Sequence, residues 1–386
     1  MSSSLVKMVL FCLRPVRRYA LMIKDDEDDS DDHDDSLLWS RELERHSLGD
    51  FSMAVVQANE VIEDHSEVET GKGAVFVGVY DGHGGPEASR YISDHLFAHL
   101  IRNSRERGVI TEETLRGAFS ATERGFLTLV RRTRGLKPLI AAAGSCCLVG
   151  VIRKGTLLIA NLGDSRAVLG SMNRSNKIVA EQLTSDHNAA QEEVRQELRS
   201  LHPDDPRIVV HKQGVQYMAY MFHLVQVSRS IGDAYLKRPE FSLGPSFPRF
   251  HLPEGLQRPV LSAEPCVYTR VLQTSDKFVI FASDGLWEHV SNQQAVEIVH
   301  KHPRPGIARM LVRRAMNIAA KKKGMMYDDL KKVERGVRRF FHDDITVAVI
   351  FIDNELLMVE KATVPELSIK GFSHTVGPSK FSLFFS

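Results

Sequence analysis

Two short apolar runs, separated by only three residues, set the strongest limit on how this chain can fold. The first run spans Cys146–Ile152, the second spans Thr156–Ala160, and Arg153-Lys154-Gly155 lies between them. Parallel neighbours need a crossover of a dozen or more residues, whereas a tight turn joins antiparallel strands. The pair therefore predicts a β-hairpin and argues against a doubly wound parallel sheet.

Other parts of the chain alternate between strand-like and helix-like patterns. Short runs of β-branched and aromatic residues predict strands over Ala74–Tyr80, Lys277–Ala282 and Ile345–Ile352. Apolar residues at helical spacing predict helices over Pro86–Arg102, Thr111–Arg131, Asn188–Ser200, Asn292–Lys301 and Arg304–Lys323. Closely paired strands interleaved with helices favour an α+β layered domain.

Composition changes at both ends of the chain. Residues 1–24 carry five basic residues and no acid, and Asp25–Asp35 reads DDEDDSDDHDD. Such a block of like charge repels itself and cannot form a core. We predict a disordered segment over residues 1–36, basic and then acidic, a folded domain over 37–353, and a loosely ordered tail over 354–386. The basic start fits a tail with no targeting role, a transit peptide or a membrane-surface anchor.

The bulk numbers exclude several classes of protein. A net charge of +1 over 386 residues gives no reason to expect a nucleic-acid-coating protein. No run reaches the ~18–20 apolar residues of a membrane span. The four cysteines form no disulfide or zinc framework, so a reducing compartment fits best. We expect an intracellular monomer in the cytoplasm, in the nucleus or at the cytoplasmic face of the plasma membrane, with membrane contact only through partners or the basic N-terminus.

Acidic residues recur where the predicted strands end. Asp81, Asp164 and Asp284 each follow an apolar strand, Asp343-Asp344 leads into another, and Glu63-Asp64 precedes the first. A single Asp-Gly after a strand is usually only a turn. If these strand ends converge, however, the carboxylates crowd together and bound cations must offset their repulsion. Because every donor is an oxygen, Mg²⁺ or Mn²⁺ fits and zinc does not. Two such ions can lower the pKa of a bound water towards ~7.

The acidic motifs occur in a characteristic order. The series is Tyr80-Asp81-Gly82-His83-Gly84-Gly85, Gly163-Asp164-Ser165-Arg166-Ala167, Ser228-Arg229-Ser230-Ile231-Gly232-Asp233, Ala282-Ser283-Asp284-Gly285-Leu286-Trp287 and Asp343-Asp344-Ile345-Thr346. It resembles the motif series of type 2C metal-dependent protein phosphatases over roughly Phe51 to Asp353. Five motifs in one order are far more specific than any one of them.

The resemblance implies an α-β-β-α sandwich of two antiparallel sheets flanked by helices. It implies a serine/threonine phosphatase that uses two Mg²⁺ or Mn²⁺ ions per subunit, with a third, weaker metal position. By motif, Asp64 would hold a metal-bound water and His83 would protonate the leaving oxygen. The implied metal ligands are Glu63, Asp81, the Gly82 carbonyl, Asp164, Asp284 and Asp343.

The resemblance also implies partners. Phosphorylated proteins would be the substrates, and no nucleic acid is expected. The segments Phe51–Asn59 and Trp287-Glu288-His289 resemble the plant clade D branch of the family. That branch suggests proton pumps or receptor kinases as substrates and small auxin-induced proteins as inhibitors.

Two places depart from the family pattern. Asn59 stands where many members have an arginine that grips phosphate, and asparagine brings neither charge nor a bidentate fork. The segment Gln216–Leu224 replaces a usually shorter stretch. These departures leave open a pseudo-phosphatase that binds phosphoproteins without turnover. A two-metal nuclease would need a basic groove with aromatic residues, which the sequence lacks.

A cysteine-phosphatase loop is a further alternative, because Cys147 and Arg153 have the required spacing. That loop needs small residues whose backbone N–H groups cradle phosphate. The residues between them instead form an apolar strand, so we reject this alternative.

Overall fold

The computed structural model describes residues 35–205, 208–212, 215–218, 226–252, 258–357 and 364–385. Residues 1–34 lie outside this range. The prediction of disorder for most of the N-terminal segment therefore lies outside the described residues. Of Gln216–Leu224, only residues 216–218 are described.

Two antiparallel sheets form the centre of the fold. The first has six strands: β1 (Leu38–His46), β2 (Gly49–Val56), β16 (Ile345–Phe351), β15 (Asp276–Ala282), β9 (Arg166–Met172) and β10 (Ile178–Gln182), in that order across the sheet. The second has seven: β14 (Cys266–Val271), β8 (Thr156–Leu162), β7 (Cys147–Arg153), β4 (Ala74–Tyr80), β3 (His65–Gly71), β17 (Leu367–Lys370) and β18 (Val376–Pro378).

The predicted hairpin is confirmed. Strands β7 and β8 pair antiparallel, with Arg153 opposite Thr156. Lys154 and Gly155 have φ values of 49° and 71°. Positive φ at both turn residues is the type I′ geometry, which matches the right-handed twist of the flanking strands.

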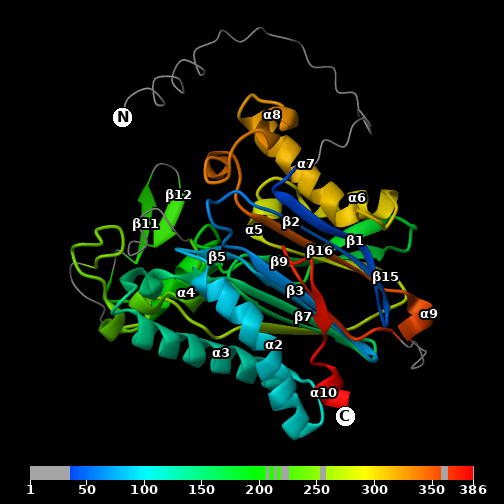
Figure 1. The fold of residues 1–386 in the computed structure, drawn as a ribbon, viewed down its shortest axis with the longest axis horizontal. Coiled ribbons are helices and arrows are strands. Elements are labelled where there is room, and N and C mark those ends of the chain that lie inside the picture. The colour runs from blue at the N-terminus through cyan, green and yellow to red at the C-terminus, as the bar shows by residue number, and fades with distance from the viewer. Residues whose placement is uncertain are drawn as a thin grey trace. The chain divides into compact units, whose positions relative to one another are not determined.

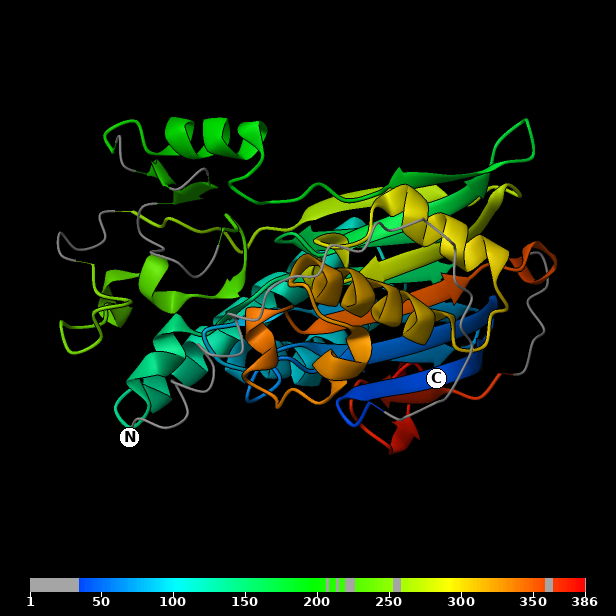
Figure 2. The same ribbon diagram turned by 90° about the horizontal axis from the view of Figure 1, so that it is seen from above.

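Four helices cover the outer faces of the sheets. Helices α2 (Glu87–Arg107) and α3 (Glu112–Thr133) lie against the seven-stranded sheet, whereas α6 (Asn292–Lys301) and α7 (Ile307–Lys322) lie against the six-stranded sheet (Figures 1 and 2). Thr111 starts α3 with a capping box, which satisfies N–H groups that have no partner within the helix. A third buried cluster fills the space between the sheets. The predicted α-β-β-α sandwich is confirmed.

Short elements connect this framework. Helix α4 (Glu192–Leu201) begins later than the predicted Asn188, because Asn188 pairs with Val227 in an isolated β-bridge. The other short helices are η1 (Pro138–Ala142), η2 (Ala234–Leu236), η3 (Pro239–Phe241), α5 (Asp284–Trp287), α8 (Tyr327–Lys331), η4 (Arg338–Phe340), α9 (Asn354–Leu357) and α10 (Ser382–Phe385). The short strands are β5 (Gly82–His83), β6 (Gly144–Ser145), β11 (Val209–Lys212), β12 (Val215–Met218) and β13 (Ile231–Gly232).

The C-terminal residues differ from the expected loosely ordered tail. Strand β17 pairs with β3 and extends the seven-stranded sheet. Ile369 and Phe381 are buried, and a Cβ on Gly71 would collide with the Phe381 ring. The described part of residues 354–386 therefore packs as part of the domain, because β17 satisfies an edge that β3 would otherwise expose.

The last residue of the acidic block is part of the folded domain, which the prediction did not include. Asp35, its last residue, is 3% exposed. Its carboxylate accepts hydrogen bonds of 3.1 and 2.9 Å from the guanidinium of Arg338, which is fully buried. A buried pair of this kind anchors the chain, so the folded domain includes Asp35.

None of the helices that the structure describes is long and apolar enough to span a bilayer.

Candidate metal centre

Antiparallel pairing brings the acidic residues to one end of the sandwich. The end of β15 lies beside the start of β16, with Ala282 opposite Val347. In the other sheet, the end of β4 lies beside the start of β3, with Tyr80 opposite His65. The residues just beyond these positions are Asp284, Asp343, Asp81 and Asp64. Alternating strand direction therefore gathers acids from distant parts of the sequence.

Three of the acids form the centre of the cluster. Asp81 and Asp164 each offer a ligand oxygen within 4.8 Å of the other and of the Cys146 sulfur. The backbone N–H of Asp284 lies 3.5 Å from Asp81 Oδ2. Asn188 donates a 2.6 Å hydrogen bond to Asp164 Oδ2 and holds that side chain in place.

The electrostatics of the cluster favour a bound cation. Burial, followed by the charges of Asp64 and Asp343, raises the pKa of Asp81 well above its usual range. Burial and then the charge of Asp81 do the same to the pKa of Asp284. Burial also raises the pKa of Asp343 to about 7. Divalent cations would relieve these repulsions and allow the carboxylates to ionise together.

The donor set fits such cations. Within the described residues, Asp284 Oδ1 is a buried oxygen without a hydrogen-bond partner. Cys146 lies in the cluster, but burial and the neighbouring Asp164 raise the pKa of its thiol well above the usual range. Its sulfur donates to Asp164 Oδ1 at 3.4 Å, as a protonated thiol does. The remaining oxygen donors suit Mg²⁺ or Mn²⁺.

Asp344 holds the loop that carries Glu63 and Asp64. Its Oδ1 accepts the backbone N–H groups of Ala58 (2.6 Å) and Asn59 (3.1 Å). Its Oδ2 accepts those of Glu63 (2.8 Å) and Asp64 (3.4 Å). One buried carboxylate thus organises the whole turn, a role that the sequence did not reveal because the partners lie 280 or more residues away.

Glu63 and Asp64 face different parts of the cluster. Glu63 Oε1 accepts the Gly85 N–H at 2.6 Å, and a Cβ at Gly82 would collide with the Glu63 carbonyl oxygen. Glycine at position 82 therefore permits a close backbone approach at a predicted ligand. Asp64 is 4% exposed and accepts the Thr346 hydroxyl at 2.7 Å.

His83 lies beside the cluster and pairs with Asp233. The two side chains meet at 2.8 Å between Nε2 and Oδ2, and Ser230 donates to the same oxygen at 2.6 Å. Burial opposes the charged imidazole, but the Asp233 carboxylate outweighs it and raises the pKa of His83. The motif containing Asp233 is visible in the sequence, yet only the structure links it to His83.

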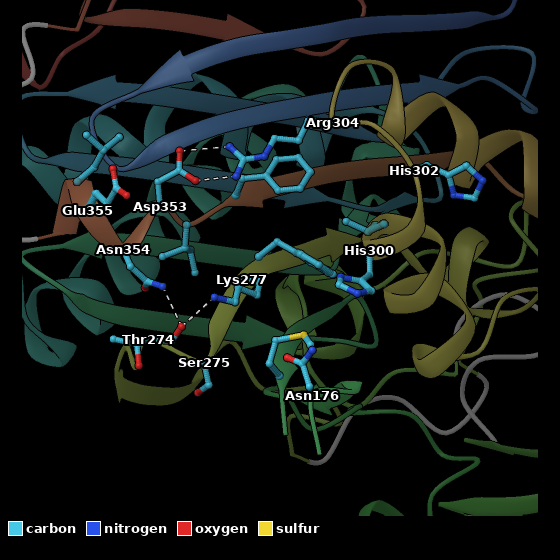
Figure 3. Close-up of a pocket in the computed structure, with 16 residues that line it drawn as sticks. Asn176, Thr274, Ser275, Lys277, His300, His302, Arg304, Asp353, Asn354 and Glu355 are labelled. Atoms are coloured by element: carbon cyan, nitrogen blue, oxygen red, sulfur yellow. Dashed lines mark hydrogen bonds and ion pairs between the residues drawn. The ribbon is translucent and has the colours of Figure 1, made fainter. Parts of the chain in front are cut away.

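The structure thus brings Glu63, Asp64, Asp81, Gly82, His83, Asp164, Asp284 and Asp343 to one end of the fold. The roles predicted for them stay predictions. A large cavity of about 1090 Å³ lies elsewhere, at the opposite end of the sandwich (Figure 3). None of the predicted site residues lines it, so cavity size does not identify the chemically active region here.

Comparisons with known proteins identify the family of this chain. A family model described as protein phosphatase 2C matches residues 50–324. The chain is 82% identical to probable protein phosphatase 2C 68 of Arabidopsis thaliana over the full length of both chains. It is 65% identical to probable protein phosphatase 2C 43 of Oryza sativa subsp. japonica over 96% of both.

A solved structure shares the fold. The crystal structure of serine-threonine phosphatase 2C from Toxoplasma gondii aligns with a TM-score of 0.55 and 17% sequence identity, over 82% of this chain and 99% of that one. The family model and the full-length relatives together settle the classification. The chain belongs to the protein phosphatase 2C family.

Proposed function

We propose that this protein hydrolyses phosphoserine and phosphothreonine in protein substrates with Mg²⁺ or Mn²⁺. The observation that carries the proposal is the cluster of buried carboxylates at one end of the sandwich, whose raised pKa values call for divalent cations. Family membership supports the reaction class.

Two metal ions would be held by the predicted ligands. Asp81 would bridge them, with the Gly82 carbonyl and Glu63 on one side and Asp284 and Asp343 on the other. Asp164, beside Asp81, would complete a third, weaker position. When bound, such ions polarise the phosphoryl group and make water nucleophilic near neutral pH. Asp64, fixed by Thr346, would orient that water.

His83 would supply the proton for the leaving group. As the water oxygen bonds to phosphorus, the bond between phosphorus and the serine or threonine oxygen breaks, and that oxygen needs a proton. Burial opposes the charged imidazole, but Asp233 outweighs it and raises the pKa of His83, which favours the protonated form that can act as an acid. The 2.8 Å contact also fixes the orientation of the ring.

The resemblance to clade D extends the proposal to partners. Substrates would be membrane proton pumps or receptor kinases, and small auxin-induced proteins would inhibit the enzyme. We place the monomer in the cytoplasm, in the nucleus or at the cytoplasmic face of the plasma membrane.

The direct test uses the full-length protein, one phosphothreonine peptide and one oligonucleotide, each with Mn²⁺ and then with EDTA. We expect phosphate release from the peptide only, abolished by EDTA. Binding of the peptide without turnover would instead support the pseudo-phosphatase, and cleavage of the oligonucleotide would support a nuclease.

A further inference from the structure

We propose that Arg339 binds the substrate phosphoryl group, in the role that an arginine at position 59 would otherwise fill. The inference rests on the proposed phosphatase function. It concerns only how this chain grips phosphate with asparagine at position 59.

Arg339 belongs to η4 and lies at the edge of the acidic cluster. Its Nη1 atom is 2.5 Å from Oδ2 of Asp343, a predicted metal ligand. After burial, which opposes its charge, the strongest influences on the guanidinium come from Asp343, Asp284 and Asp81, and together they raise its pKa. Burial raises the pKa of Glu63, and the charge of Arg339 is one of the influences that oppose this rise. A cation at this place is close to ligands proposed for both metals.

The guanidinium remains accessible. The Arg339 side chain is 50% exposed, whereas that of Asp343 is 18% exposed. A guanidinium carries five N–H donors in a fixed fork, more than one carboxylate can accept, and Nη1 lies toward Asp343. Arginine can therefore bind Asp343 and a phosphoryl oxygen together, because its fork suits bidentate contact with both carboxylate and phosphate.

Two arginines in the motif series, by contrast, already use their guanidinium groups in contacts within the protein. Arg166 donates from Nε and Nη2 to the carboxylate of Asp186 at 2.6–2.9 Å, and only 24% of its side chain is exposed. Arg229 binds Glu197 at 2.8 Å and the Glu264 carbonyl at 3.1 Å, with 18% exposed. Either would have to break a buried or half-buried ion pair to reach a substrate.

The backbone beside Arg339 is fixed in advance. Arg338 is fully buried, binds Asp35, and donates further hydrogen bonds to the carbonyls of Val333 (3.1 Å) and Lys331 (3.1 Å). Adjacent residues in this turn have opposite roles: Arg338 anchors the segment and Arg339 projects toward the acids. A fixed backbone lowers the entropy lost when the side chain meets phosphate.

The test measures binding of inorganic phosphate to the Mn²⁺-loaded, full-length protein by titration calorimetry. For Arg339→Gln we expect the Kd for phosphate to rise about ten- to hundred-fold, the worth of a charge-assisted hydrogen bond. The matched control is Arg335→Gln, an exposed arginine on the same loop, which should leave the Kd unchanged. Adding Asn59→Arg to Arg339→Gln should restore much of the affinity, because it again places a guanidinium beside the phosphate.

A parallel titration with Mn²⁺ alone separates the two roles that Arg339 could have. An unchanged phosphate Kd in Arg339→Gln, or an equal loss in Mn²⁺ affinity, would overturn the proposal, because Arg339 would then act only on its neighbour Asp343. Failure of the proposed function would look different: the wild-type protein would release no phosphate from the phosphopeptide.

Discussion

Buried carboxylates have opposite environments at the two ends of the β-sandwich. At the end described above, Asp81, Asp164 and Asp284 crowd together, and their pKa values rise. At the other end, where β15 begins, Asp276 is fully buried and accepts two hydrogen bonds of 3.1 Å from Arg270. The ends are about 20 Å apart, given ~3.3 Å per strand residue.

A second ion pair repeats the pattern at that far end. Arg304 binds Asp353 at 2.6 Å on the wall of the large cavity (Figure 3). It also binds Asp50 at 2.9 Å. The hydrogen bonds that Arg304 donates to Asp353 raise the pKa of its guanidinium. Arginines therefore neutralise the far end within the chain itself. At the near end, Arg339 pairs with only one of several acids, so divalent cations would have to offset the remaining charges. This difference distinguishes a structural cluster of acids from a functional one.

The largest effect should come from Asp81→Asn. Because Asp81 would bridge both metals, its loss should lower kcat on a small aryl phosphate by on the order of 10³-fold or more. Steady-state kinetics in Mn²⁺ measure this. The same change at the far end, Asp50→Asn, should leave kcat unchanged. Near-wild-type turnover of Asp81→Asn would remove the distinction between the ends.

The next largest effect should be on stability, at the far end. Asp276→Asn leaves Arg270 without its buried partner and should cost about 2–3 kcal/mol in the free energy of unfolding. Urea denaturation in EDTA measures this loss. Asp284→Asn is the matched control: in EDTA it should leave stability unchanged or raise it, since it removes a carboxyl group whose ionisation burial and Asp81 oppose. Equal losses in both variants would show that the two clusters are alike.

The pH dependence of stability should differ between the metal-free and the metal-loaded protein. Burial raises the pKa of Asp343 from its usual 3.8 to about 7, so between these values the folded state holds a proton that the unfolded state releases. The metal-free protein should therefore lose about 2–3 kcal/mol of stability as pH rises from 5 to 7.5. With Mn²⁺ bound, the carboxylates ionise together and this loss should vanish.

Thermal unfolding at a series of pH values, with Mn²⁺ or with EDTA, checks this difference. Superimposable pH profiles in the two conditions would contradict it, because the acids would then not be the groups that bind the metal.

The sequence predicts those parts of the molecule that depend on local pattern. The hairpin at Arg153-Lys154-Gly155 and the acids after the apolar strands could be identified because each is a short, contiguous signal. Their convergence followed from antiparallel pairing, which places the end of one strand beside the start of the next. The ordered motif series supplied the family, and with it the sandwich.

Contacts between distant segments could not be predicted in this way. His83 meets Asp233 across 150 positions, and Asp35 meets Arg338 across 303. Neither pair has a periodic signal, because each depends on how two completed elements pack. Strand β17 was missed for a related reason: four residues are too few to show alternation, and its pairing with β3 stabilises it.

The smallest effect should come from Arg304→Gln, and it tests whether the two ends are independent. Arg304 is 38% exposed, so solvent screens its pairs with Asp50 and Asp353, and their loss should cost about 0.5–1 kcal/mol. Its guanidinium also lies 4.7 Å from the centre of the Phe351 ring, a contact that glutamine would weaken. Because no proposed ligand touches this group, kcat, KM and the Mn²⁺ requirement should all match the wild type. A clear fall in turnover with the fold intact would mean that β15 and β16 transmit strain along their length, and the far-end pairs would then help to position Asp284 and Asp343.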